Sequence, residues 1–109
     1  MTWLIVPVGS RKGLPRAQAL ELWASQTEAS TAALKTPSRY AAWRKLPSRY
    51  FIASDDEIIT MQSQLAIAKR AHSNVTILHR GSHVTLISHP TAVTAVIRKA
   101  LSSPVSAGA

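Results

Sequence analysis

A short apolar run that ends abruptly in acidic residues, between Ser48 and Thr60, constrains the fold of this chain more than any other feature. Residues 50–53, Tyr-Phe-Ile-Ala, are rich in aromatic and β-branched side chains and follow Pro47, which predicts a short buried strand. Three of the five acidic residues of the chain come directly after it, as Asp55, Asp56 and Glu57. In open α/β sheets ligands bind beyond the carboxyl ends of the strands, so an aspartate here is a candidate functional residue.

The next segment completes a βαβ unit. Residues 60–71 are predicted to form an amphipathic helix, and residues 75–78, Val-Thr-Ile-Leu, a second strand that ends at Arg80-Gly81. The apolar face of the helix is expected to contain Met61, Leu65, Ala68 and Ala71. The two strands of such a unit are parallel, with a right-handed crossover, and their carboxyl ends share one edge. Asp56 and His83, 27 positions apart, are therefore expected to lie within hydrogen-bond distance of each other.

Helices are predicted on both sides of this unit in the sequence. Pro90 begins a helix whose apolar stripe is expected to cover the sheet, with Ala92, Val93, Val96, Ile97, Ala100 and Leu101. Residues 14–34 have helical periodicity and predict a helix that can break near Ser30. Residues 3–8 can form a strand interrupted at Pro7, and the small residues of 102–109 are expected to fray.

The positive charge of the chain raises a second functional class. Thirteen Lys and Arg against five Asp and Glu give a formal charge of +8, which attracts polyanions such as nucleic acid. The segment 37–51 is the best local candidate, because basic and aromatic side chains interleave there: Arg39, Tyr40, Trp43, Arg44, Lys45, Arg49, Tyr50 and Phe51. However, no nucleic-acid-binding motif is present, and solvated basic helix faces explain the same charge, so nucleic acid is the weaker interpretation.

Length and composition exclude several classes of protein. A chain of 109 residues forms at most one small domain, and the absence of cysteine excludes disulfides, thiolate metal sites and a cysteine nucleophile. No run approaches the roughly 18 apolar residues of a membrane span, so we expect a soluble protein that does not bind membranes, with the cytoplasm as the default location. The spacing of His79, His83 and His89 is unusual for a metal site, and we expect neither a metal nor a cofactor.

An ordered series of short segments extends from about Leu14 to Leu101. It contains residues 42–51 (AWRKLPSRYF), 54–59 (SDDEII), 68–71 (AKRA), 82–84 (SHV) and 88–90 (SHP), followed by Ala92, Val93 and Ile97. In this order the segments resemble the C-terminal part of small, esterase-like serine α/β-hydrolases. No single segment is diagnostic, and the specificity of the resemblance lies in the series.

The resemblance implies an α/β fold, namely the C-terminal βαβα part of an α/β-hydrolase fold with parallel strands and flanking helices. It divides the chain into a helical cap-like segment and connector (1–46), the βαβα part (47–101) and a flexible tail (102–109). It also implies that Asp56 is the acid and His83 the general base of a Ser-Asp-His triad, with Asp55 as the second choice for the acid. The alternatives are an acidic cluster favoured by a helix N-terminus and an ordinary loop histidine.

The departure from the family concerns the nucleophile. The family's Gly-x-Ser-x-Gly motif is absent, because the glycines are at 9, 13, 81 and 108. We therefore expect a truncated or split hydrolase that is inactive alone. Its expected partners are an ester-like small molecule in the parent family, and a complementary N-terminal hydrolase half or further copies that associate through exposed sheet edges. A small basic module that binds nucleic acid or another polyanion stays open, and salt dependence of binding would distinguish it.

Overall fold

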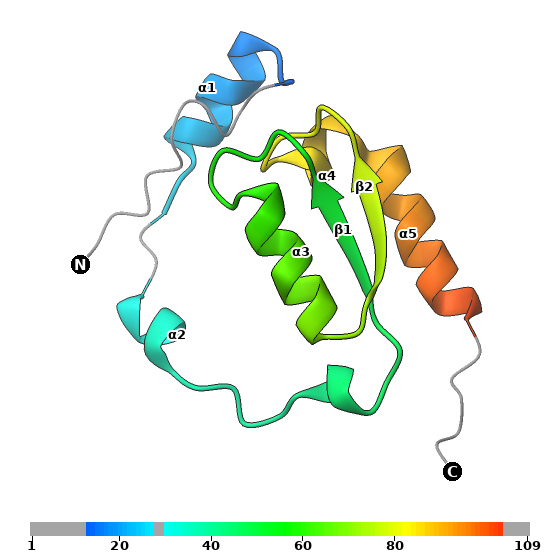
Figure 1. The fold of residues 1–109 in the computed structure, drawn as a ribbon. Coiled ribbons are helices and arrows are strands. Elements are labelled where there is room, and N and C mark those ends of the chain that lie inside the picture. Colours follow the sequence, from blue (N-terminus) through cyan, green and yellow to red (C-terminus); the bar gives the residue numbers. More distant parts are fainter. Residues whose placement is uncertain (1–12, 28–29, 104–109) are drawn as a thin grey trace.

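The computed structural model describes residues 13–27 and 30–103. These residues form a mixed α/β structure, in which a two-stranded parallel sheet has helices on both sides (Figure 1). The strand expected within residues 3–8 lies outside the described residues, as does the tail from residue 104 on. No helix of the described part is long and apolar enough to cross a membrane.

The sheet confirms the predicted βαβ unit. Strand β1 (Arg49–Ala53) pairs in parallel with β2 (Asn74–Leu78), and Ile52 lies opposite Ile77. The carboxyl-terminal half of β1 forms the centre of the small core, since Ile52 is fully buried and Ala53 is 6% exposed. The first three residues of β1 are only half-buried, so the strand is less buried than its apolar sequence predicts.

Helix α3 (Met61–Arg70) connects the two strands and packs against β1. It begins where predicted, because the hydroxyl of Thr60 caps its N-terminus by accepting a hydrogen bond from the amide of Ser63 (3.2 Å). The predicted apolar face is partly wrong: Ala68 is buried, but Leu65 is 37% exposed and the buried side chain one turn before Ala68 is Gln64. The amide of Gln64 can be buried because it is hydrogen-bonded at the sheet edge.

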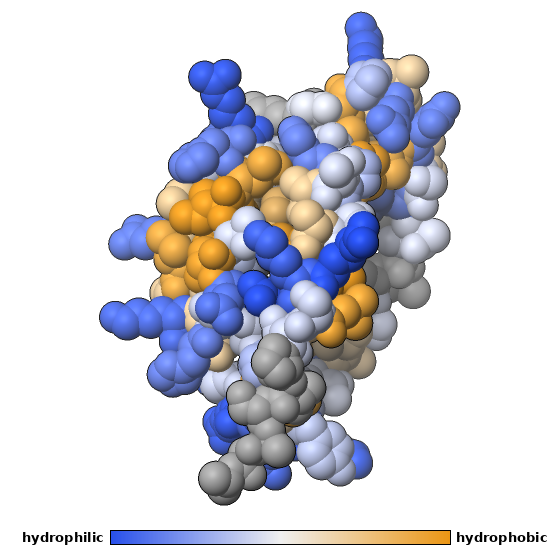
Figure 2. Space-filling model, turned by 90° about the vertical axis from the view of Figure 1, so that its right-hand side faces the viewer, coloured by the Kyte–Doolittle hydropathy of each residue, from blue (hydrophilic) through white to orange (hydrophobic). Residues whose placement is uncertain are grey.

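Helix α5 (Pro90–Ser102) lies on the other side of the strands from α3 and packs against β1 (Figure 1). Pro90 occupies the first helical turn, as the sequence predicts. The short helix α4 (Thr85–Ser88), which precedes it, was not predicted. The apolar stripe of α5 covers the sheet only in part, since Ile97 and Leu101 stay exposed, and hydrophobic side chains gather on the surface of this face (Figure 2).

The helix predicted over residues 14–34 is divided in two. Helix α1 (Arg16–Ala24) ends well before α2 (Thr31–Lys35), and Ser30 caps α2 by accepting a hydrogen bond from the amide of Ala32 (3.2 Å). Neither helix has a buried residue, and Leu20 and Trp23 are more than half exposed. A 3₁₀ helix, η2 (Ala42–Arg44), follows before β1. The division of the chain at residue 46 stays a prediction.

Candidate active site

Hydrogen bonds between the two loops that follow β1 and β2 fix the carboxyl edge of the sheet. The amide of Ser54 donates to the carbonyl of Leu78 (3.0 Å), and the amide of Asp55 donates to the carbonyl of Gly81 (2.9 Å). In return, the amide of Arg80 donates to the hydroxyl of Ser54 (2.9 Å). Side chains on the two loops are therefore held at defined positions relative to each other.

Gly81 allows the second loop to approach the sheet this closely. A Cβ atom at Gly81 would lie 3.0 Å from a methyl carbon of Leu78 and 3.1 Å from both the Cβ of Ala53 and the Oγ1 of Thr85. These distances are shorter than ordinary van der Waals contacts, so with a side chain here the neighbouring atoms would have to shift by a few tenths of an ångström. The residue before Gly81, Arg80, has a left-handed backbone conformation (φ 63°), which turns the chain toward His83.

The carboxylate of Asp56 is the most highly connected group at this edge. Its Oδ1 atom accepts hydrogen bonds from the amides of Ile58 (2.8 Å) and Ile59 (3.0 Å), which hold the turn before α3. Its Oδ2 atom accepts a hydrogen bond from the side-chain amide of Gln64 (3.3 Å), which also donates to the carbonyl of Ile59 (2.7 Å). The side chain of Asp56 is only 7% exposed. Its position is thus set by neighbours from its own turn and from α3.

This environment favours the ionised form of Asp56. Burial acts to raise the pKa of the carboxyl group, but the backbone amide of Ile59, the side chain of His83 and the backbone amide of Ile58 donate hydrogen bonds that lower it, and positive charge on His83 lowers it further. The net effect is a pKa below the ordinary value for aspartate. Asp56 therefore acts as a hydrogen-bond acceptor at neutral pH.

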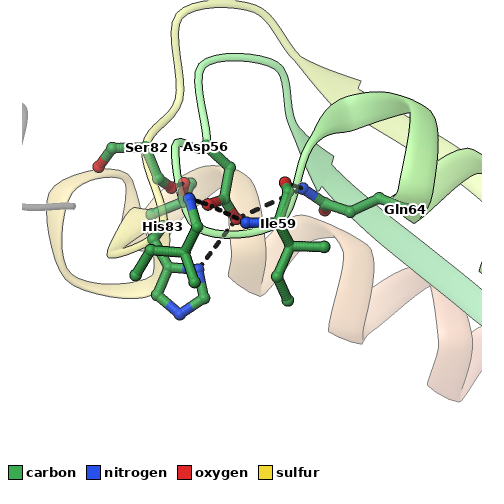
Figure 3. Close-up of polar contacts among 7 residues, drawn as sticks. Asp56, Ile59, Gln64, Ser82 and His83 are labelled. Carbon is green, nitrogen blue, oxygen red and sulfur yellow. Dashed lines mark hydrogen bonds and ion pairs between the residues drawn. The ribbon is translucent and has the colours of Figure 1, made fainter. Parts of the chain in front are cut away.

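His83 completes the arrangement from the second loop. Its Nδ1 atom lies 2.9 Å from the Oδ2 atom of Asp56, so the expected proximity of these residues is confirmed (Figure 3). A carboxylate can only accept, so Nδ1 carries the proton and the Nε2 atom of a neutral His83 ring has a free lone pair. Nε2 points away from Asp56, and the His83 side chain is 36% exposed. Such a nitrogen can take a proton from a hydroxyl group or water.

Asp55 and the other three histidines are not part of the hydrogen bond between Asp56 and His83. Asp55 accepts a hydrogen bond from the hydroxyl of Ser54 (2.8 Å) and is exposed, so Asp56 is the aspartate that contacts His83. His72, His79 and His89 are all exposed, and His89 shares a hydrogen bond with Ser88 (2.8 Å). Within residues 13–27 and 30–103, no three His, Asp or Glu side chains come close enough together to hold a metal ion.

An open hollow of about 430 Å³ lies along β1 and reaches the pair. Asp56 and His83 line it, together with Tyr50 and Phe51 of β1. Ser82 also lines the hollow; it is 3% exposed, and its hydroxyl has no hydrogen-bond partner among the described residues. The Ser82 side chain points away from the ring of His83, so it is not placed to lose its proton to Nε2 (Figure 3).

One known protein is similar to part of the chain. Over 68 residues, or 62% of this chain, the sequence is 34% identical to the alpha/beta hydrolase nvfD of Aspergillus novofumigatus. The chain is thus a partial and distant relative of an α/β hydrolase. It spans about a quarter of the length of that curated relative, since the match covers 27% of nvfD. No protein-family model matches the chain, and no solved structure does.

Sequence reasoning missed one member of the site, Gln64. The predicted apolar face of residues 60–71 does not include it, although it is 6% exposed and donates hydrogen bonds to both Asp56 and Ile59. Its position four residues before Ala68, on the same helix face, was the available signal, because a polar residue in phase with buried residues needs a partner. Gln64 is therefore a positioning residue for Asp56.

Proposed function

We propose that this chain supplies the acid and the histidine of a serine α/β-hydrolase active site, with Asp56 as the acid and His83 as the general base. The hydrogen bond between them carries the proposal. A histidine whose Nδ1 is bonded to a fixed carboxylate, and whose Nε2 is free, is arranged as a triad histidine must be. The similarity to nvfD supports the hydrolase class, and ester or related acyl hydrolysis is the proposed reaction type.

In this proposal His83 first accepts a proton and then donates it. Nε2 removes the proton from a serine hydroxyl as the oxygen attacks an acyl carbon, and the positive ring that results is stabilised by ionised Asp56. Nε2 then gives the proton to the departing alcohol oxygen. General-base action of this kind typically contributes about 10²–10⁴-fold to a rate. Asp56 keeps its negative charge throughout, which agrees with the lowered pKa of its carboxyl group.

The serine and the oxyanion donors come, in this proposal, from a polypeptide segment other than these 109 residues, because the Gly-x-Ser-x-Gly motif is not among them. The outer edge of β1 is the proposed docking place. β1 bonds to β2 through the carbonyl of Ser48 and the amide of Ser54, so the backbone groups of Arg49 and Phe51 face the other way. A complementary hydrolase half that added a strand there would enter the hollow beside His83.

Reconstitution tests this proposal. The chain is co-expressed with nvfD from which the matched 68-residue segment has been removed, and labelling by a serine-directed phosphonate and hydrolysis of an activated ester are measured. We expect the mixture to gain labelling and hydrolysis that neither part has alone. His83→Ala and Asp56→Ala should remove the gain, whereas His89→Ala, an exposed histidine outside the pair, should keep it. A gain that His83→Ala and His89→Ala reduce equally would refute the role of His83.

The same edge is the proposed route of self-association when the complementary half is absent, because an exposed strand edge presents unpaired amides and carbonyls to other chains. Size-exclusion chromatography with light scattering is expected to show oligomers of the chain at high concentration. A stable monomer under those conditions would argue against an open edge.

A further inference from the structure

A second hollow lies at the opposite end of the sheet from Asp56 and His83. Its volume is about 390 Å³, within the range of about 300–1,000 Å³ typical of small-molecule pockets. It is bordered by the amino end of β1, the last turn of α3, the residues just before each strand and the 3₁₀ helix η2, and its lining includes Trp43, Ser48, Tyr50, Ile67, Arg70 and Ser73. Asp56 and His83 do not line this hollow, although Arg49 and Tyr50 line both hollows.

Two arginines converge on one indole ring here. The guanidinium carbon of Arg44 lies 5.3 Å from the centre of the Trp43 ring, and that of Arg70, from α3, lies 5.9 Å from it. Stacking holds the planar guanidinium group by its face and leaves the N–H groups along its edge able to bind an anion. The sequence analysis grouped Arg44 with Trp43 in the segment 37–51, but it did not predict that Arg70 lies beside the same ring.

The positive charge of the cluster is not balanced locally. No acidic residue lines the hollow, and no carboxylate in the described part of the chain forms an ion pair with Arg44 or Arg70. The carbonyls of the last turn of α3 at 67, 68 and 69 already accept hydrogen bonds from the amides at 71, 73 and 72. The positive charge of Arg44 and Arg70 can therefore bind an anion from outside the chain.

The rest of the lining is suited to a flat apolar group. The rings of Trp43 and Tyr50 and the half-exposed side chain of Ile67 border the hollow. The hydroxyls of Ser48 and Ser73 are joined by a hydrogen bond (2.6 Å) and supply polar contacts beside the arginines. The apolar side chains can pack against a planar ring. The arginines and the two hydroxyls can bind an anionic group attached to that ring.

We propose that this hollow binds a nucleotide. The edge of the Arg70 guanidinium group bonds to the phosphate, and the base packs against Trp43, Tyr50 and Ile67. The proposal does not rest on Asp56, on His83 or on the hydrolase proposal, although this hollow shares Arg49 and Tyr50 with the one that reaches that pair. The same chemistry is present in a free mononucleotide and in one unit of a single strand, so the test compares these two sources.

Calorimetric titration of the 109-residue chain with adenosine monophosphate at low salt tests the site. We expect saturable 1:1 binding, with adenosine alone and inorganic phosphate alone each at least about tenfold weaker, since each makes only part of the contacts. Arg70→Gln should weaken the binding of adenosine monophosphate by at least about tenfold. Arg39→Gln removes the same charge from an exposed position outside the hollow and should have little effect.

The results of these titrations distinguish a specific nucleotide site from non-specific attraction of anions to a positively charged chain. Absence of saturable binding, or equal losses in Arg70→Gln and Arg39→Gln, would overturn it. Arg70→Lys, which keeps the charge without the fork of donors, serves as a second variant in case Arg70→Gln unfolds the chain, and it should bind more weakly than the natural protein. A ten-nucleotide single strand that binds more tightly, with steep salt dependence, identifies the strand as the source; equal affinities identify the free nucleotide.

Discussion

The Nδ1 atom of His83 lies 2.9 Å from the Oδ2 atom of Asp56, although 27 positions separate the two residues in the chain. The contact joins the loops that follow two neighbouring parallel strands. Because the Asp56 carboxylate also accepts hydrogen bonds from Ile58, Ile59 and Gln64, the histidine meets an acceptor that is already fixed. The orientation of the His83 ring is therefore set by the fixed carboxylate of Asp56.

Gln64 is expected to stabilise the protein through this network. Replacing it by leucine removes one of the two side-chain donors to Oδ2 of Asp56 and the donor to the carbonyl of Ile59, and each hydrogen bond of this kind typically contributes about 0.5–1.5 kcal/mol. Urea unfolding should show a loss of that size. The matched control is Gln62→Leu, at an exposed position of the same helix, which should change stability by less than about 0.5 kcal/mol. Equal effects would mean that the Gln64 contacts contribute nothing.

The lowered pKa of Asp56 predicts a loss of stability in acid. Because the carboxyl group binds its proton less readily in the folded chain than in the unfolded chain, its stabilisation is fully present above the ordinary aspartate pKa of about 3.9. It is lost as the pH falls through the lower pKa of the folded state. Unfolding free energies measured from neutral pH downward should therefore fall less steeply below about pH 4 in Asp56→Asn than in the natural chain.

The control for this pH series is Asp55→Asn, which removes a neighbouring carboxyl group but leaves the contact with His83. It should keep more of the acid-side decrease than Asp56→Asn. If the free energy of unfolding changed with pH in the same way in both variants, the fold would not stabilise the ionised form of Asp56, and the prediction would be wrong.

Gly81 is expected to tolerate no side chain. An alanine methyl group would crowd Leu78, Ala53 and Thr85 at 3.0–3.1 Å, and overpacking of this kind typically costs about 1–3 kcal/mol. Thermal and urea unfolding of Gly81→Ala measure the loss. The neighbouring substitution Ser82→Ala removes a buried hydroxyl that has no hydrogen-bond partner among residues 13–27 and 30–103, and it should cost no more than about 0.5 kcal/mol. A Gly81→Ala protein as stable as the natural one would show that the loop can move aside.

Much of this edge could be predicted from the sequence. The apolar runs at 50–53 and 75–78 are strong strand signals, and the helical spacing between them leaves a parallel pair as the simple arrangement. Parallel order alone then brings Asp56 and His83 to one edge. Local signals sufficed here because each element is short, continuous and bounded by turn residues.

Other features could not be predicted because they depend on side-chain contacts that the local periodicity does not show. Gln64 is buried through Asp56 and Ile59, which a helical wheel does not show. The break expected near Ser30 is confirmed, but its extent could not be predicted, since the first helix already ends at Ala24. Arg70 joins Trp43 only because α3 runs antiparallel to the strands and ends beside η2.

The isolated 109-residue chain is expected to be inactive toward esters. A general base accelerates acyl transfer only with a nucleophile to activate, and loss of a single oxyanion donor typically costs about 10²–10³-fold. The chain should therefore hydrolyse an activated ester no faster than its His83→Ala variant, and a serine-directed phosphonate should leave it unlabelled. Stoichiometric labelling that one serine substitution abolishes would show that the chain has its own nucleophile.

The protonation of the His83 ring tests the central claim most directly. In ¹⁵N-labelled protein at about pH 8.5, where imidazole is neutral, the nitrogen chemical shifts of His83 report which ring nitrogen carries the proton. If Asp56 orients His83 as a base, Nδ1 is protonated and Nε2 is not, and Asp56→Ala loses this preference while the shifts of exposed His89 stay unchanged. A proton on Nε2 of His83 in the natural chain, or shifts that Asp56→Ala leaves the same, would contradict the account.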